Sequence, residues 1–155
     1  MIAKEVGWGI SASTAQRLVN VGVSAIDVAG AGGTSWSQVE MYRAETKAQA
    51  RLAAAFINWG IPTADSIQMV KSSVPNTPII ASGGIKSGID IGKALALGAV
   101  MGGMAGTFLK AANQSTEAVS LTIDELIREI KVCMFGAGVG NISELQNTPL
   151  HKRTE

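Results

Sequence analysis

Short apolar runs alternate with amphipathic segments along the chain. Four runs rich in Ile, Val and Ala predict β-strands near residues 2–6, 25–29, 78–82 and 99–103. Between and after these runs, apolar residues recur every three to four positions, which predicts helices. We expect them at 13–21, 46–59, 63–74, 87–97, 108–112, 122–134 and 141–146. This order of four βα units is typical of a parallel sheet with helical crossovers.

Polar residues at the helix starts refine this interpretation. Ser87 followed by Asp90, and Thr122 followed by Glu125, have the spacing of capping boxes at helix N-termini. One face of the predicted helix 46–59 is lined by apolar residues, which are Ala48, Leu52, Ala55, Phe56 and Trp59.

Two predicted strands end in glycines. The run 79–85 opens into Gly83 and Gly84, and the run 99–106 ends with Gly102, Gly103 and Gly106. Glycine lets backbone N–H groups approach an anion closely. Paired glycine loops after successive strands are typical of the phosphate site of a (β/α)₈ barrel.

Two α/β architectures are compatible with this order: an open doubly wound sheet and half of a TIM-type barrel. A Rossmann-like sheet would carry its G-x-G-x-x-G motif after the first strand, where Gly7 and Gly9 have no third glycine. A complete barrel needs about 250 residues. The pattern therefore favours a half-barrel of four βα units over residues 1–155.

Composition limits the class of protein. The 155 residues are 46% hydrophobic and 16% charged, which is typical of a globular domain, and the net charge of +1 gives no reason to expect nucleic acid. The chain has no apolar run long enough for a membrane span and no signal-peptide pattern at its start, so we expect a cytoplasmic protein. Cys133 is expected in a helix core, His151 in solvent, and the tail after about residue 148 is expected to fray.

Several motifs together resemble one family. They are Lys4-Glu-Val-Gly-Trp-Gly-Ile-Ser11, Asp27-Val-Ala-Gly-Ala-Gly-Gly-Thr-Ser-Trp36, Trp59-Gly-Ile-Pro-Thr63, Ser82-Gly-Gly-Ile-Lys-Ser-Gly88 and Gly103-Met-Ala-Gly106. In order and spacing, this set resembles the C-terminal half of type 2 isopentenyl-diphosphate isomerases. The resemblance implies βα units 5 to 8 of a TIM barrel that binds FMN, is reduced by NADPH or NADH, and uses Mg²⁺ on the substrate diphosphate. The family interconverts isopentenyl and dimethylallyl diphosphate.

The resemblance also implies site residues. Lys4 would contact the flavin, where an ammonium stabilises the anionic reduced form. Thr34 would donate its hydroxyl to the flavin edge, and Ala29, where relatives carry serine, could contact it only through the backbone. The FMN phosphate would bind to N–H groups of Gly84, Ile85, Lys86, Ala105 and Gly106.

Glu40 is the candidate catalytic residue, because allylic isomerisation adds a proton at one carbon and removes one at another. It lies four residues after Trp36, so a helical turn would point both side chains the same way. Trp36 is a candidate substrate contact, and Arg43 would hold either Glu40 or the diphosphate.

The chain also departs from the family. Family members carry, before the Lys-Glu-Val-Gly motif, a glutamine that contacts the substrate and a glutamate on Mg²⁺, and neither segment is in this sequence. Two functions stay open: half of an isomerase that needs its N-terminal half or a second copy, and a phosphate- or FMN-binding module without turnover. Another FMN barrel, such as a 2-hydroxy-acid oxidase or inosine-monophosphate dehydrogenase, is disfavoured because Cys133 and His151 lie outside the predicted loops.

Overall fold

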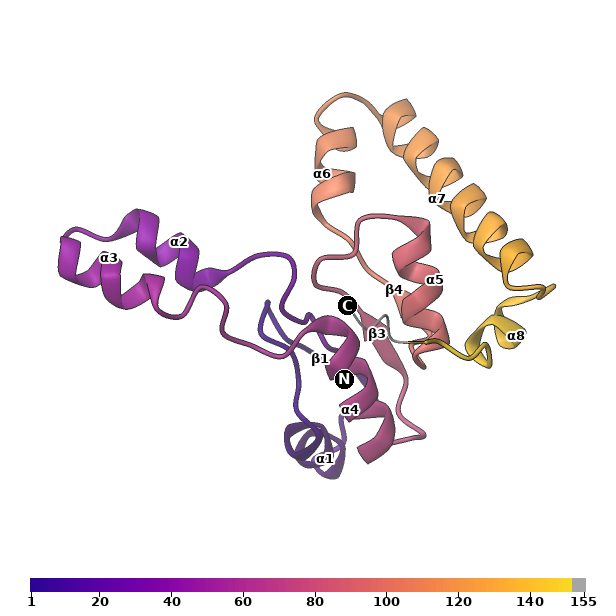
Figure 1. Ribbon diagram of the computed structural model, residues 1–155, viewed down its shortest axis with the longest axis horizontal. Helices are drawn as coiled ribbons and strands as arrows, with labels where there is room; N and C mark the ends of the chain where they lie inside the picture. Colours follow the sequence, from indigo (N-terminus) through magenta and orange to yellow (C-terminus); the bar gives the residue numbers. More distant parts are fainter. Residues whose placement is uncertain (152–155) are drawn as a thin grey trace.

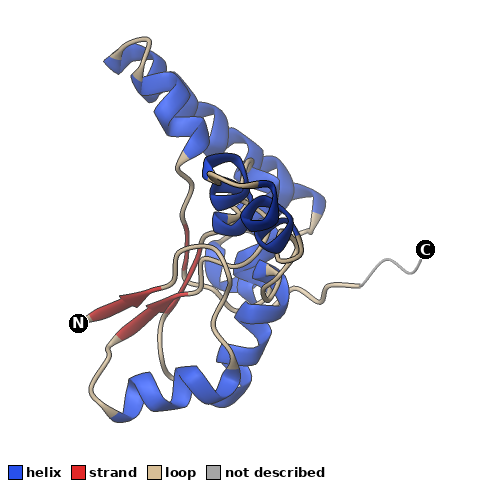
Figure 2. Ribbon diagram, turned by 90° about the vertical axis from the view of Figure 1, so that its left-hand side faces the viewer, coloured by secondary structure: helices blue, strands red, loops and turns tan. Residues whose placement is uncertain are grey.

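Four short parallel strands form the centre of the molecule. The computed structural model describes residues 1–151, and its strands are β1 (Ile2–Lys4), β2 (Ala25–Asp27), β3 (Ile79–Ala81) and β4 (Met101–Gly102). Their order in the sheet equals their order in the chain, with Ile80 paired to Met101. This confirms the prediction that successive βα units lie side by side. Each strand is shorter than predicted. β1 and β2 each end two residues earlier, where the chain turns into a loop at the carboxyl edge (Figure 2), and β3 and β4 are shorter at both ends.

The helices fall into three groups, which Figure 1 labels. The helices α1 (Ala12–Asn20), α4 (Thr63–Ser73) and α5 (Gly88–Ala96) each lead to the next strand. Between β2 and α4, α2 (Trp36–Arg43) and α3 (Lys47–Ala54) pair as a hairpin, here called the arm, that projects away from the sheet. After β4 come α6 (Gly106–Ala112), α7 (Thr116–Gly136) and α8 (Ile142–Gln146).

The core lies between one face of the sheet and the helices. Alternate strand residues point to opposite faces, and one set is buried against α1 and α4. Ile67 and Val70 of α4 are buried, as the sequence predicts. The strands and the residues directly after them contribute four fully buried residues to this core, which are Ile26, Val28, Ile79 and Ala81.

The opposite face of the sheet is open. Lys4, Asp27, Ile80 and Met101 are in register across it, and Ile2 lies two residues before Lys4 on the same face. Ile2 is 60% exposed and Met101 58% exposed, although both are large apolar side chains. In a closed barrel this face would be the packed interior. The chain therefore has the layers of a half-barrel, with helices outside and an uncovered inner face.

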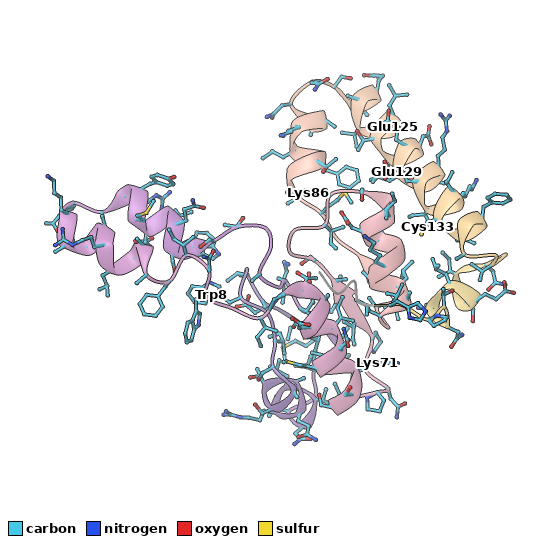
Figure 3. The ribbon with its side chains drawn as sticks, viewed as in Figure 1. Trp8, Lys71, Lys86, Glu125, Glu129 and Cys133 are labelled. Atoms are coloured by element: carbon cyan, nitrogen blue, oxygen red, sulfur yellow. The ribbon has the colours of Figure 1, made fainter. Side chains whose placement is uncertain are left out.

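Helix α7 packs on α5 through two glycines. Gly88 and Gly92 lie one turn apart on α5, opposite Glu129 and Cys133 of α7. Figure 3 shows the two α7 residues on the side that faces α5. The Glu129 carboxylate also accepts a hydrogen bond from the Gly88 N–H, so it caps the start of α5. Small residues here let the two backbones approach closely.

We expect Gly88→Ala to destabilise the chain by about 1–3 kcal/mol through overpacking. An added Cβ would lie 2.5 Å from Glu129 Cβ and 2.6 Å from the Leu126 carbonyl oxygen. Urea denaturation measures the loss. Gly136→Ala is the matched control, because its Cβ meets nothing within 4 Å and alanine favours helices. Equal urea midpoints for the two variants would contradict the role given to Gly88.

Three sequence predictions about helices are wrong. Instead of one helix over 46–59, α3 ends at Ala54, and the separate helix α2 precedes it. Leu52 and Trp59 belong to the apolar face of that predicted helix, but the two residues are 68% and 64% exposed. Helix α7 begins at Thr116, capped by Ser115, so Thr122 lies inside it and donates to the Ala118 carbonyl instead of capping.

The Ser87 cap is half of the predicted capping box. The Ser87 hydroxyl accepts from the Asp90 N–H, as expected. The Asp90 carboxylate instead accepts from the Lys86 N–H. Asn141 caps α8 as predicted. The tail expected to fray after about residue 148 extends into 152–155, which lie outside the described residues.

Candidate functional site

Three side chains meet at the carboxyl ends of β1, β2 and β3. Lys4 Nζ donates to Asp27 Oδ2 at 2.8 Å and to Ser82 Oγ at 3.1 Å. The Ser82 hydroxyl donates to Asp27 Oδ1 at 2.6 Å, which closes a ring of three hydrogen bonds. Asp27 is buried, whereas the Lys4 side chain is 57% exposed. The cluster therefore presents a fixed ammonium group at the open face of the sheet.

Ala29 and Thr34 both belong to the β2 loop, and Ala29 contacts this cluster. Ala29 has φ +34°, outside the usual range for a residue with a Cβ, and its N–H donates to Asp27 Oδ1 at 3.2 Å. Thr34 is exposed, and its carbonyl oxygen lies against Gly7 of the β1 loop. Lys4, at the end of β1, and Ala29 and Thr34, in the β2 loop, thus lie at the same edge of the sheet.

The glycines after β3 are required by loop packing. A Cβ on Gly83 would lie 2.2 Å from the Gly30 carbonyl oxygen, and one on Gly84 would lie 2.5 Å from the Gly32 carbonyl oxygen. Both glycines have positive φ. The β2 and β3 loops therefore contact each other backbone to backbone. A valine at Gly84 would break this contact whether or not phosphate binds there, so it is no clean test of a phosphate site.

Donors for an anion remain at this edge. Within residues 1–151 the N–H groups of Gly84 and Ile85 have no hydrogen-bond partner, whereas the Lys86 N–H is taken by Asp90. Gly103 packs beside Ser82, so the β4 loop adjoins the β3 loop. Beyond it, Ala105 and Gly106 begin α6, and a Cβ on Gly106 would meet nothing within 4 Å.

The other candidates lie on the arm. Trp36, Glu40 and Arg43 line an open groove of about 690 Å³, with the aromatic rings of Trp8 and Phe56 among the other walls. Because α2 is a helix from Trp36 onward, Glu40 lies one turn after Trp36, as the sequence predicts. The Trp36 indole donates to the Val6 carbonyl at 2.8 Å and ties the arm to the β1 loop. Figure 3 shows Trp8 where the arm joins the body.

The predicted site residues fall into two separate groups in the structure. None of the groove-lining residues belongs to the Lys4 cluster or to the glycine loops. Arg43 is not paired with Glu40, because the only ion pair within residues 1–151 is that of Lys4 with Asp27. The groove joins an apolar aromatic wall, a carboxylate and a guanidinium, a combination that could contact an apolar chain with an anionic head.

Sequence reasoning missed Asp27, Ser82 and Trp8. Asp27 is a charged residue inside an otherwise apolar strand, and Ser82 directly precedes the Gly83–Gly84 pair. A buried carboxylate needs a cationic or hydrogen-bonding partner. That rule could have identified Asp27, but it could not have chosen Lys4 from among the cations.

The described residues contain neither a metal centre nor a membrane span. Residues 1–151 include no group of His, Cys, Asp or Glu side chains that could hold a metal ion. In the same residues no helix has the length and apolar character needed to cross a bilayer.

Comparisons with known proteins agree with the motifs. A family model described as FMN-dependent dehydrogenase matches residues 1–152. The chain is 50% identical over 150 residues to an isopentenyl-diphosphate delta-isomerase of Rickettsia bellii, covering 97% of this chain and 44% of the relative. It is 50% identical over 145 residues to the Rickettsia felis protein of the same name, covering 94% and 42%. The chain thus spans less than half the length of these relatives.

Solved structures confirm the fold. A lactate oxidase from Pediococcus acidilactici superimposes with a TM-score of 0.76 at 22% identity, covering 99% of this chain and 37% of its own. A mandelate oxidase variant with an FMN adduct gives a TM-score of 0.68 at 21% identity, covering 94% and 40%. Both are TIM-barrel oxidoreductases, so the half-barrel predicted from the glycine loops is confirmed at the level of the fold.

Proposed function

Since the chain belongs to the FMN-dependent dehydrogenase family, we propose that it forms the C-terminal half of a type 2 isopentenyl-diphosphate isomerase. The observation that carries the proposal is 50% identity to isomerases across 97% of the chain. The structural neighbours act on other substrates, and at 21–22% identity they support the fold only. The reaction in this proposal is the interconversion of isopentenyl and dimethylallyl diphosphate.

The residues present fit FMN. Among residues 1–151, the N–H groups of Gly84 and Ile85 have no hydrogen-bond partner and lie beside the β4 loop. The open space at Gly106 leaves room for a phosphate at the start of α6. The N–H groups of Ala105 and Gly106 would complete this cradle, whereas Lys86 would contribute only after releasing Asp90. Lys4, at the end of β1, and Thr34, in the β2 loop, would reach the isoalloxazine ring.

The bound flavin would supply an electron-rich ring close to the substrate double bond. This chain's own part is to hold charge and protons. Lys4 would place its ammonium against the flavin's pyrimidine side, where negative charge develops on reduction. Glu40 would hold or pass a proton at its carboxylate. The exposed position of Glu40 on the arm requires that the arm close over the substrate, with Trp36 and Arg43 on the same helix.

The Mg²⁺ of the proposed enzyme would not be held by this chain alone. The described residues have no metal-binding group, so Mg²⁺ on the substrate diphosphate would need ligands from the N-terminal half. NADPH would reduce the flavin. A cytoplasmic location belongs to the same proposal, and cell fractionation tests it.

The open inner face predicts association. Exposed Ile2 and Met101 lie on a sheet with two free edges, which soluble monomers avoid. We expect the isolated chain to dimerise or aggregate at tens of micromolar, and to form a one-to-one complex when the N-terminal part of the Rickettsia bellii isomerase is co-expressed. Light scattering measures both. If the chain stays monomeric and does not bind the N-terminal part, the half-barrel proposal is contradicted.

The decisive test of function uses that complex. We expect it to bind FMN, and to convert isopentenyl to dimethylallyl diphosphate when NADPH and Mg²⁺ are present. The chain alone should show no turnover, because it lacks the substrate and metal residues. The second candidate is a phosphate- or FMN-binding module. It is favoured by the N–H groups of Gly84 and Ile85, which have no partner in the described part of the chain. It would bind FMN without any turnover in the complex.

A further inference from the structure

We infer that Asp27 and Ser82 are positioning residues that fix the Lys4 ammonium, leaving one N–H free for the flavin. The inference rests on the proposed function, because it assumes that FMN binds beside Lys4. Its basis is the ring of hydrogen bonds that joins the three side chains across β1, β2 and the β3 loop.

Asp27 is the anchor of the ring. Its carboxylate accepts from Lys4 at Oδ2 and from both Ser82 and the Ala29 N–H at Oδ1. Its side chain is only 11% exposed, so its orientation is set by packing within the sheet as well as by these bonds. A buried carboxylate with every partner in place is a rigid reference point for a longer, mobile side chain.

Ser82 sets the direction of the hydrogen bonds. Its hydroxyl donates to Asp27, and its oxygen therefore receives the second N–H of Lys4. A lysine ammonium has three N–H donors, so one remains. The Lys4 side chain is half exposed at the inner face, where the third donor has no partner within residues 1–151. A carbonyl or anionic oxygen of a bound flavin is the kind of acceptor that it would take.

Fixing Lys4 matters because a free lysine side chain loses rotamer entropy when it is held in one geometry. In this chain the ring holds the side chain before any ligand arrives. A purely structural role, joining three loops, is the alternative. The two roles differ in what they predict for the flavin's reduction potential.

The sign of the potential change separates the roles. Removing the negative charge of Asp27 near the flavin would by itself make its midpoint potential more positive. Releasing the Lys4 ammonium removes a stabilising positive charge from the reduced form and makes the potential more negative. We expect Asp27→Asn, Ser82→Ala and Lys4→Met all to lower the midpoint potential, although only two of them remove a charge.

The experiment uses the complex with the Rickettsia bellii N-terminal part, and a second readout needs no flavin. Exchange of the Lys4 Nζ–H protons with water, followed by NMR on the ¹⁵N-labelled complex, should accelerate at least about tenfold in Asp27→Asn and Ser82→Ala. The matched controls are Asp65→Asn and Ser73→Ala on α4, which leave the ring intact. Adding Asp27→Asn to Lys4→Met should produce no further fall in potential.

Two results would overturn the inference: unchanged exchange in Ser82→Ala, or a more positive potential in Asp27→Asn. Ser82→Ala keeps the Lys4–Asp27 ion pair and the net charge, so it stays informative if Asp27→Asn fails to fold. If the parent complex binds no FMN, the proposed function fails, and the exchange rates still decide whether Asp27 and Ser82 hold Lys4.

Discussion

Replacing Gly106 with valine should weaken FMN binding at least about hundredfold and leave the stability of the chain unchanged. An added Cβ at Gly106 would meet no atom within 4 Å, and the residue has no positive φ. The structure therefore shows neither a clash at the Cβ nor backbone strain for a substituted residue at this position. Its branched side chain would fill the space that the FMN phosphate needs beside the first turn of α6, so the loss of affinity, about 2.7 kcal/mol, would come from the ligand alone.

Quenching of FMN fluorescence in the complex measures this affinity, and a thermal melt measures stability. Gly136→Val is the matched control, since Gly136 is also helical and also has open space around its missing Cβ. We expect the control to bind FMN like the parent. If Gly106→Val binds FMN as tightly as Gly136→Val, the phosphate does not lie at the start of α6.

Glu40→Gln should lower the rate of isomerase turnover at least about a hundredfold, while FMN binding persists. A positioned general acid or base contributes about 10²–10⁴ in rate, and glutamine keeps the size of the side chain but cannot exchange the proton. Because Glu40 lies on the arm and the predicted FMN contacts lie on the sheet loops, the flavin should not sense the change. Conversion of isopentenyl to dimethylallyl diphosphate by the reduced complex measures the rate.

Glu45→Gln is the control for charge in the same groove, because Glu45 also lines it. We expect this variant to retain most of the activity. Normal turnover of Glu40→Gln would mean that Glu40 is only a surface residue of α2. A similar loss in both variants would instead indicate a general effect of groove charge on diphosphate binding.

Much of the sheet could be read from the sequence. A parallel strand buried on one face is specified by a short run of β-branched residues, as in Ile79–Ala81, and the glycines that follow must turn the chain. Because the strands of consecutive βα units usually lie side by side, their order in the chain alone predicted that β3 and β4 are adjacent in the sheet. The helices nearest the sheet were also predictable, since Ile67 and Val70 of α4 recur with helical spacing against the core.

The arm could not be read in this way. The face of Leu52, Phe56 and Trp59 has the periodicity of a buried helix, yet this segment projects from the sheet and stays exposed. Sequence periodicity reports that an apolar face exists, but it does not say which surface covers it. The start of α7 was missed for a related reason. Ser115 and Thr122 can both cap a helix, and the packing of α7 on α5 and on α6 favours the longer helix.

The sequence by itself determined the half-barrel order, the glycine loops and the family, because strand order and backbone turns depend on local residue type. Only the tertiary structure decided the site's contacts. It joined Lys4 to Asp27 and Ser82, residues 23 and 78 positions away, since parallel strands bring their carboxyl ends to one edge. It also showed that Gly84 is required by the Gly32 backbone and that Gly106 is free of such contacts. Those distances are set by loop packing, which no local pattern encodes.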